Sequence, residues 1–153
     1  MKPRKFKSKN HLKGFDFIFT IIGVLAVVIS IIVPAVSYSH LPDQIPTHYN
    51  ASGLPDAYGD KINIWRLPFI GLVLFIGCFL LDTLLSQQDD YPKGLLLGMG
   101  NFLALTFAYL IISKIQIATS ARTSLGAYFL PVFLLLITGL IIYSILKSNK
   151  PTN

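Results

Sequence analysis

The chain contains four long apolar segments that few charges interrupt. A helix that rises about 1.5 Å per residue needs about 20 residues to cross the hydrocarbon core of a bilayer, and each segment is of that order. Within that core only helices or closed barrels satisfy every backbone group, and continuous segments of this length favour helices. The sequence therefore predicts an all-α membrane protein, a single domain over 1–153 with four transmembrane helices at about 15–37, 64–85, 94–117 and 123–146.

Composition agrees with a lipid environment. Hydrophobic residues make up 53% of the chain and charged residues 13%, with a mean hydropathy of +0.62. A water-soluble domain carries about 25% charged residues, so the low charge excludes an ordinary soluble class. The single cysteine, Cys78, lies within the second apolar segment, and a lone cysteine forms no internal disulfide.

The distribution of Lys and Arg predicts that both termini are cytoplasmic. Four spans place both ends on one side, and the side richer in Lys and Arg stays in the cytoplasm. Most of the 13 basic residues lie on the side of the termini: Lys2, Arg4, Lys5, Lys7, Lys9, Lys13, Lys93, Lys147 and Lys150. The others are Lys61, Arg66, Lys114 and Arg122. The long loop at about 38–63 then faces outward.

The net charge of +6 does not indicate a nucleic-acid partner. Nearly half of the basic residues form one run directly before the first span, where such a run orients the protein and attracts anionic lipid. The lipid bilayer is therefore the predicted partner, and no nucleic acid is expected. A cleaved signal peptide is the alternative for this N-terminal region, but the apolar run at 17–33 is longer than the usual signal core of about 7 to 15 residues.

The outer loop concentrates the polar chemistry of the chain. Between Leu41 and Asp56 it holds three prolines, one histidine and two carboxylates. Because proline fixes φ and pushes the preceding residue toward extended conformations, we expect an extended run over 41–47. Asn, Asp and Gly residues predict two tight turns, at 50–53 and 55–59. We therefore expect an ordered loop that caps the helix ends.

Several residues of this loop resemble a bacterial integral-membrane family of unknown function: Leu41-Pro42-Asp43, Ile45-Pro46-Thr47-His48-Tyr49-Asn50, Gly53, Pro55-Asp56 and Lys61. The same module forms the N-terminal half of SdpI-type immunity proteins, which protect a producing bacterium from a secreted toxin. The resemblance covers 41–61, and the other spans match only in hydropathy. It implies a multi-pass protein of the bacterial plasma membrane whose binding or loop-ordering residues are Pro42, Asp43, Pro46, Thr47, His48, Asn50, Gly53, Pro55, Asp56 and Lys61.

Three functions remain open. The first is a non-enzymatic immunity or signalling protein whose outer loop binds a secreted peptide, a toxin or an envelope component. The second is a metal- or pH-responsive site centred on His48, since histidine changes charge near neutral pH, with His40, His48 and Asp56 as candidate metal ligands. The third is an accessory subunit of a larger membrane complex. A purely structural role, in which His48 bonds a carboxylate or a backbone carbonyl and holds the loop shape, is the simpler alternative for that residue.

The sequence gives enzymatic activity no support. It has no nucleophile elbow, phosphate loop or paired intramembrane carboxylates, so neither catalytic residues nor a cofactor are predicted. Lys114 lies one turn inside the outer end of the third helix. It either extends to the headgroups or, like Arg66 or Arg122, meets an acid of the loop, namely Asp43, Asp56 or Asp60. Gly94 and Gly98 form a small-xxx-small pair that would permit a homodimer.

Overall fold

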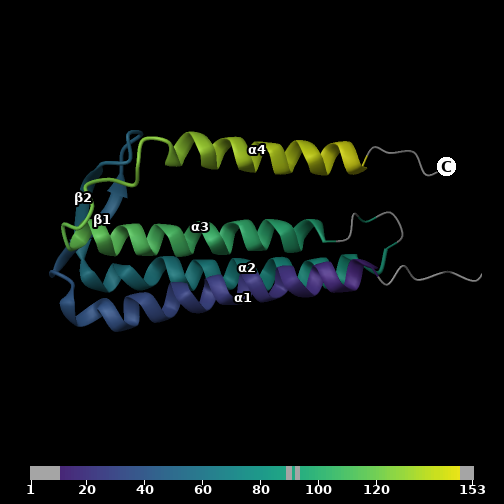
Figure 1. Cartoon of the computed structure of the whole chain (residues 1–153), viewed down its shortest axis with the longest axis horizontal. Helices are drawn as coiled ribbons and strands as arrows, with labels where there is room; N and C mark the ends of the chain where they lie inside the picture. Colours follow the sequence, from purple (N-terminus) through teal and green to yellow (C-terminus); the bar gives the residue numbers. More distant parts are fainter. Residues whose placement is uncertain (1–10, 89–90, 92–93, 149–153) are drawn as a thin grey trace, which may run out of the picture.

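The structure is a computed structural model that describes residues 11–88, 91 and 94–148 (Figure 1). Most of these residues form the helices α1 (His11–Ser37), α2 (Arg66–Leu85), α3 (Leu95–Ala118) and α4 (Phe129–Ser148). Between α1 and α2 lie the 3₁₀-helix η1 (Tyr38–His40), the strands β1 (Gln44–Tyr49) and β2 (Pro55–Asp60), and the 3₁₀-helix η2 (Lys61–Trp65).

Three helical segments are long and apolar enough to cross a membrane: Phe17–His40, Lys61–Leu85 and Leu95–Ala118. The described part of α4 adds a shorter apolar helix, Phe129–Ile142. The chain is thus a mostly helical, multi-pass membrane protein. The sidedness of the termini stays a prediction, but the described start of α1 and the described end of α4 lie at the same end of the molecule (Figure 1).

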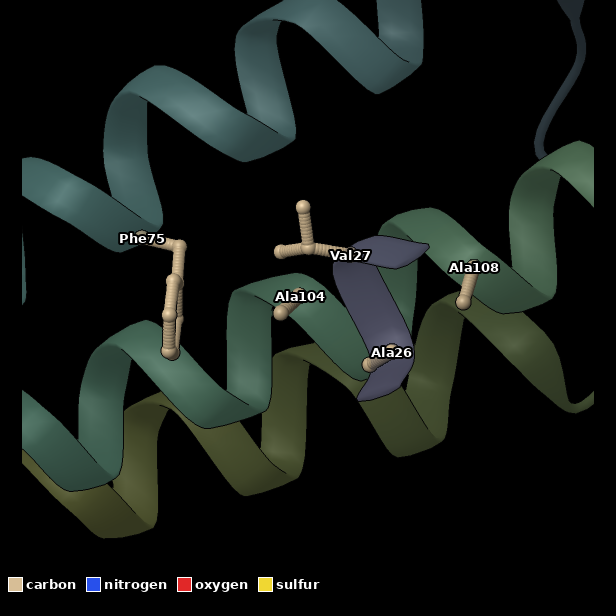
Figure 2. Close-up of a cluster of buried hydrophobic side chains, with 5 residues drawn as sticks. All are labelled: Ala26, Val27, Phe75, Ala104 and Ala108. Carbon is tan, nitrogen blue, oxygen red and sulfur yellow. The ribbon is translucent and has the colours of Figure 1, made fainter. Parts of the chain in front are cut away.

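Helices α1, α2 and α3 pack together around a core of small and medium side chains. Figure 2 shows this buried cluster, to which α1 contributes Ala26 and Val27, α2 contributes Phe75, and α3 contributes Ala104 and Ala108. Small residues let helix backbones approach closely, which is the usual basis of helix association in lipid. The three helices therefore form the compact part of the molecule.

Gly23 marks the closest approach of α1 to this core. A Cβ atom at that position would lie 2.2 Å from the ring of Phe75 and 2.3 Å from the Asn101 side-chain oxygen. By contrast, a Cβ at Gly98 would meet nothing within 4 Å, and Gly94 precedes α3 with a φ of 79°. Gly98 therefore makes no close helix contact among the described residues, and the predicted role of the Gly94 and Gly98 pair in a homodimer stays a prediction.

The turn between α2 and α3 is organised by one carboxylate. Asp82 accepts hydrogen bonds from the Tyr91 hydroxyl (2.7 Å), the Gly94 N–H (3.2 Å) and the Leu96 N–H (3.1 Å). A carboxylate at a helix N-terminus satisfies backbone donors that have no partner within the helix. Burial, followed by the bond to Asp82, raises the pKa of Tyr91 to about 12.

Helix α4 lies beside α3 and apart from the other two helices (Figure 1). Stacked aromatic rings join the two helices: Phe102 with Phe133 at 5.6 Å between centroids, and Tyr109 with Phe129 at 5.3 Å. The prediction that the fourth helix begins at 123 is wrong. Gly126 adopts a left-handed φ of 95°, and the linker before Phe129 bonds to the outer loop instead of continuing a helix.

The loop between α1 and α2 is an antiparallel β-hairpin, so the expectation of a purely α-helical fold is wrong here. Register pairs join Gln44 to Asp60, Ile45 to Gly59 and Tyr49 to Pro55, with irregular pairing between them. The extended run and the turn at 50–53 are confirmed, whereas the predicted turn at 55–59 is strand β2. Both strands of a two-stranded sheet are edges, which is where proline is tolerated.

Candidate functional site

The hairpin rests on the adjacent ends of the helices through a buried apolar cluster, here called the anchor cluster: Leu41, Ile45, Ile64 and Ile111. Ile45 of β1, Ile64 of η2 and Ile111 of α3 are fully buried. Burying one such side chain stabilises a fold by about 1.5 to 3 kcal/mol. The hairpin is therefore a fixed cap on the bundle rather than a loose tether.

An ion pair closes the base of the hairpin. The ammonium of Lys61 lies 3.0 Å from the Asp43 carboxylate, and the Lys61 N–H donates to the Asp43 carbonyl at 2.9 Å. The ammonium also lies 5.7 Å from the centre of the Tyr38 ring. Because the Asp43 side chain is 92% exposed, the ion pair itself contributes little, and the backbone bond defines the geometry.

A second polar contact crosses the two strands. Nδ1 of His48 lies 2.6 Å from Oδ1 of Asp56, and both side chains are exposed, at 70% and 41%. The structure thus brings together two of the three candidate metal ligands. His40 instead contacts the hydroxyl of Ser39, and the described residues contain no group of three metal-ligating side chains of His, Cys, Asp or Glu.

The tip of the hairpin is a turn built by Asn50 and Gly53. The Asn50 side-chain oxygen accepts hydrogen bonds from the N–H groups of Ser52 and Leu54, at 3.0 and 3.1 Å. Gly53 has a φ of 76°, a conformation that residues with a Cβ rarely adopt. Its carbonyl accepts a hydrogen bond from the Leu125 N–H at 2.8 Å, so the tip is joined to the linker between α3 and α4.

Arg122 holds that linker in place. Its guanidinium donates to the Ser113 hydroxyl (3.0 Å), the Tyr109 hydroxyl (3.0 Å) and the Leu125 carbonyl (2.7 Å). The Tyr109 hydroxyl donates to the same carbonyl at 2.6 Å. The sequence suggested an acid of the loop as one possible partner of Arg122 and gave no sign of this role, because none of the acceptors of Arg122 is charged.

Beneath the hairpin lies a cavity of about 270 Å³, here called the cation pocket, which is lined by Thr47, Tyr49, Asn63, Arg66, Leu67, Ile70, Leu110 and Lys114. Thr47 and Tyr49 reach it from β1, Arg66 from the start of α2, and Lys114 from α3. Lys114 is only 5% exposed. Within the described part of the chain, neither the Lys114 nor the Arg66 side chain has a hydrogen bond or an ion pair.

The predicted contact between a deep cation and an acid of the loop is wrong for the described residues. Asp43 pairs with Lys61, and Asp56 pairs with His48. Asp60 accepts a hydrogen bond from the side chain of Gln44 at 2.9 Å. The register of the hairpin thus directs all three acids to partners on the hairpin or at its base, and leaves the cations beneath it unpaired.

Tyr49 adds another polar group without a partner at this place. Its hydroxyl is buried and has no hydrogen-bond partner among the described residues. Burial, with a smaller contribution from Tyr58, raises the pKa of Tyr49 to about 12, so the phenol stays neutral near pH 7. A neutral phenol is a hydrogen-bond donor.

The remaining predicted site residues shape the hairpin. Pro46 is fully buried in β1, and Pro55 begins β2. Thr47 both lines the cation pocket and lies against Gly59, where an added Cβ would come within 3.1 Å of its methyl group. Pro42 precedes β1 on the exposed side. The predicted residues therefore form one hairpin, but they do not converge on a single reactive centre.

Comparison with known proteins gives a family match centred on this region. Residues 25–72 match the family model described as Domain of unknown function (DUF1648), a stretch from α1 through the hairpin into α2. An uncharacterized protein of Archaeoglobus fulgidus is 30% identical over 120 residues, which cover 74% of this chain and 58% of that protein. The chain thus spans less than two thirds of that relative. No solved structure matches the chain significantly.

Proposed function

We propose that this membrane protein is a non-enzymatic immunity or signalling protein of the bacterial plasma membrane. Its hairpin faces the exterior and binds a secreted peptide, a toxin or a component of the envelope. The observation that carries the proposal is a hairpin that is fixed by the anchor cluster and still presents apolar side chains to the surroundings. Leu54 is 47% exposed and Tyr58 59%, and Ile62 of the adjoining η2 is 59% exposed. The resemblance of 41–61 to SdpI-type immunity proteins supports the same function.

The geometry favours binding along β2. Strand β1 contributes the buried residues Ile45 and Pro46, whereas β2 has no buried residue. In a two-stranded sheet each strand has one edge without a strand partner, and an extended peptide can add to such an edge through backbone hydrogen bonds. Tyr58 lies within β2, where an exposed aromatic side chain would supply contact area at little entropic cost.

The test is the sensitivity of cells to secreted antimicrobial peptides. Cells expressing the wild type are compared with cells expressing Tyr58→Ala or, as a matched control, Tyr128→Ala, which removes an exposed tyrosine of the linker before α4. Protection by the wild type that Tyr58→Ala abolishes at an equal membrane level, and Tyr128→Ala retains, supports the proposal. No protection by the wild type against any peptide would exclude it.

The contact between His48 and Asp56 favours a second candidate, a pH-responsive hairpin. Histidine gains charge as pH falls from about 8 to 5, and a charged imidazole would strengthen this contact. The expected result is a peptide sensitivity that changes over this pH range in cells with the wild type, but not in cells with His48→Ala at the same level. A pH response that persists in His48→Ala would exclude it.

The third candidate, an accessory subunit, rests on the cavity of about 460 Å³ between α3 and α4, which is lined largely by aromatic and aliphatic side chains. It predicts that a larger membrane protein co-purifies in a fixed ratio in mild detergent. Purification of the chain alone or as a homodimer, which native mass spectrometry distinguishes, would favour the hairpin function over this one.

A further inference from the structure

Among the described residues, two basic side chains and no acidic side chain line the cation pocket. Lys114 is only 5% exposed, and it lies in a helix that is long and apolar enough to span a membrane. Arg66 lines the same cavity and brings a second positive charge. Two like charges around one cavity oppose each other, so the arrangement is unfavourable without an anion.

Burial makes this imbalance costly. An ammonium group removed from water without a partner is destabilised by several kcal/mol, which is why buried charges in proteins are paired. Ionisable groups within membrane-spanning helices are rare and mark functional sites by default. The acids of the hairpin, Asp43, Asp56 and Asp60, have other partners, so none of them neutralises Lys114.

The cavity also offers neutral hydrogen-bond donors. Thr47 and Tyr49 of β1 both line the cavity, and the buried Tyr49 hydroxyl has no hydrogen-bond partner among the described residues. Arg66 is exposed, as is Ile70 beside it at 45%, so the cavity is reachable from the protein surface. An ammonium, a guanidinium and hydroxyl groups around one cavity form the kind of donor set that binds phosphate oxygens.

We propose that the cation pocket binds a phosphate group, with Lys114 and Arg66 supplying the positive charge and the Tyr49 hydroxyl donating a hydrogen bond. A phosphate group spreads its negative charge over several oxygens, which an ammonium and a guanidinium can contact at the same time. The phosphate comes either from a lipid headgroup, since the pocket lies at the outer ends of the helices, or from solution. This site does not depend on the hairpin binding a peptide.

The first experiment measures binding of free phosphate. The full-length protein is purified in a maltoside detergent, which contains no phosphate, and its thermal unfolding is followed with inorganic phosphate, acetate or chloride at matched ionic strength. We expect a saturable rise in Tm with phosphate only. Lys114→Met and Arg66→Gln should each weaken the apparent affinity for phosphate at least about tenfold. Tyr49→Phe should weaken it by a smaller factor, since losing one hydrogen bond to the phosphate costs less binding free energy than losing one positive charge.

Lys61→Met is the matched control, because it removes a cation near the hairpin that does not line the pocket. It should keep the response to phosphate. Lys114→Met loses an unpaired buried charge, so its Tm without ligand should not fall, and a lost phosphate response then cannot reflect misfolding. Arg66→Gln changes an exposed residue and gives an independent check should the Lys114 variant fail to fold.

The second experiment distinguishes the lipid source. Native mass spectrometry of protein extracted from membranes records whether phospholipid stays bound. Phospholipid retained by the wild type and by Lys61→Met, but lost from Lys114→Met and Arg66→Gln, assigns the phosphate to a headgroup, even where free phosphate has no effect. The proposal is overturned when neither free phosphate nor phospholipid binds in a way that depends on Lys114 and Arg66, or when acetate stabilises the protein as well as phosphate does.

Discussion

The carbonyl of Gly53, at the tip of the hairpin, accepts a hydrogen bond of 2.8 Å from the N–H of Leu125, in the linker between α3 and α4. These two residues are far apart in the sequence. An added Cβ at Gly53 would lie 3.1 Å from the Gly126 carbonyl oxygen and 3.3 Å from the Leu125 Cβ. The contact therefore depends on a residue without a side chain.

Gly53→Ala should weaken this connection. The φ of 76° costs a residue with a Cβ about 1 to 2 kcal/mol, and the new methyl group would press on the linker. We expect faster proteolysis within the hairpin and a lower free energy of unfolding in detergent. Gly77→Ala is the control, because an added Cβ there meets nothing within 4 Å. Equal effects of both substitutions would contradict a special role of the tip.

Ile45→Ala should release the hairpin from the helices. Ile45 is fully buried in the anchor cluster, and an Ile to Ala change at such a site costs about 2 to 5 kcal/mol. The measurement is limited proteolysis of the protein in membranes, with cleavage expected between β1 and β2. Ile62→Ala removes a side chain that is 59% exposed and should leave the cleavage rate near that of the wild type. Resistance of the Ile45 variant would show that other contacts suffice.

Lys114→Met should not destabilise the protein without ligand. Removing a buried charge that has no partner abolishes its desolvation cost, and the methionine side chain fills a similar volume. Unfolding in detergent free of phosphate should give a Tm at or above that of the wild type. A clear fall in Tm would mean that Lys114 makes a stabilising contact in its empty pocket, and it would weaken the phosphate proposal.

High pH should loosen the hairpin through Tyr49. The free phenol ionises near pH 10, whereas burial raises the pKa of Tyr49 to about 12. Since the folded state holds this proton more tightly than the unfolded state, the contribution of Tyr49 to stability is complete below about pH 10 and is lost as pH rises toward 12. Proteolysis of the hairpin measured over this range should accelerate.

The Tyr49→Phe variant isolates this effect. It should show a weaker dependence on pH than the wild type, and near pH 7 it should be at least as stable, because the buried hydroxyl that it loses has no partner among the described residues. Tyr91→Phe serves as the comparison, since the pKa of Tyr91 is also raised to about 12 but its hydroxyl bonds Asp82. An unchanged pH profile in Tyr49→Phe would exclude Tyr49 as its source.

The helices were predictable because a spanning segment must be long, apolar and uninterrupted, and three described helices meet that condition. The hairpin was not recognised as a sheet because its second strand, Pro55–Asp60, consists largely of residues that disfavour strands. Tertiary contacts determine the strands instead. Ile45 is buried between the helix ends, which fixes the position of β1, and β2 pairs with β1.

The sequence indicated the cations of the cation pocket but not their lack of partners. Lys114 and Arg66 stood out as charges at the outer helix ends, but the expected partners were the nearby acids. Which acid meets which base depends on strand register, and Gln44 faces Asp60 while Tyr49 faces Pro55 only once the two strands have paired. The lack of a partner for Lys114 among the described residues therefore follows from the fold and could not be predicted from the sequence positions of the acids.

Helix α4 is connected to the hairpin through the linker that precedes it, and not through the three-helix core. Its first residue, Phe129, follows closely on Leu125 and Gly126, the segment that Gly53 and Arg122 hold. A displacement of the hairpin tip would therefore pull directly on the start of α4, whose far end lies on the opposite side of the molecule (Figure 1). Mobility of the hairpin tip and mobility of the start of α4 should therefore rise and fall together.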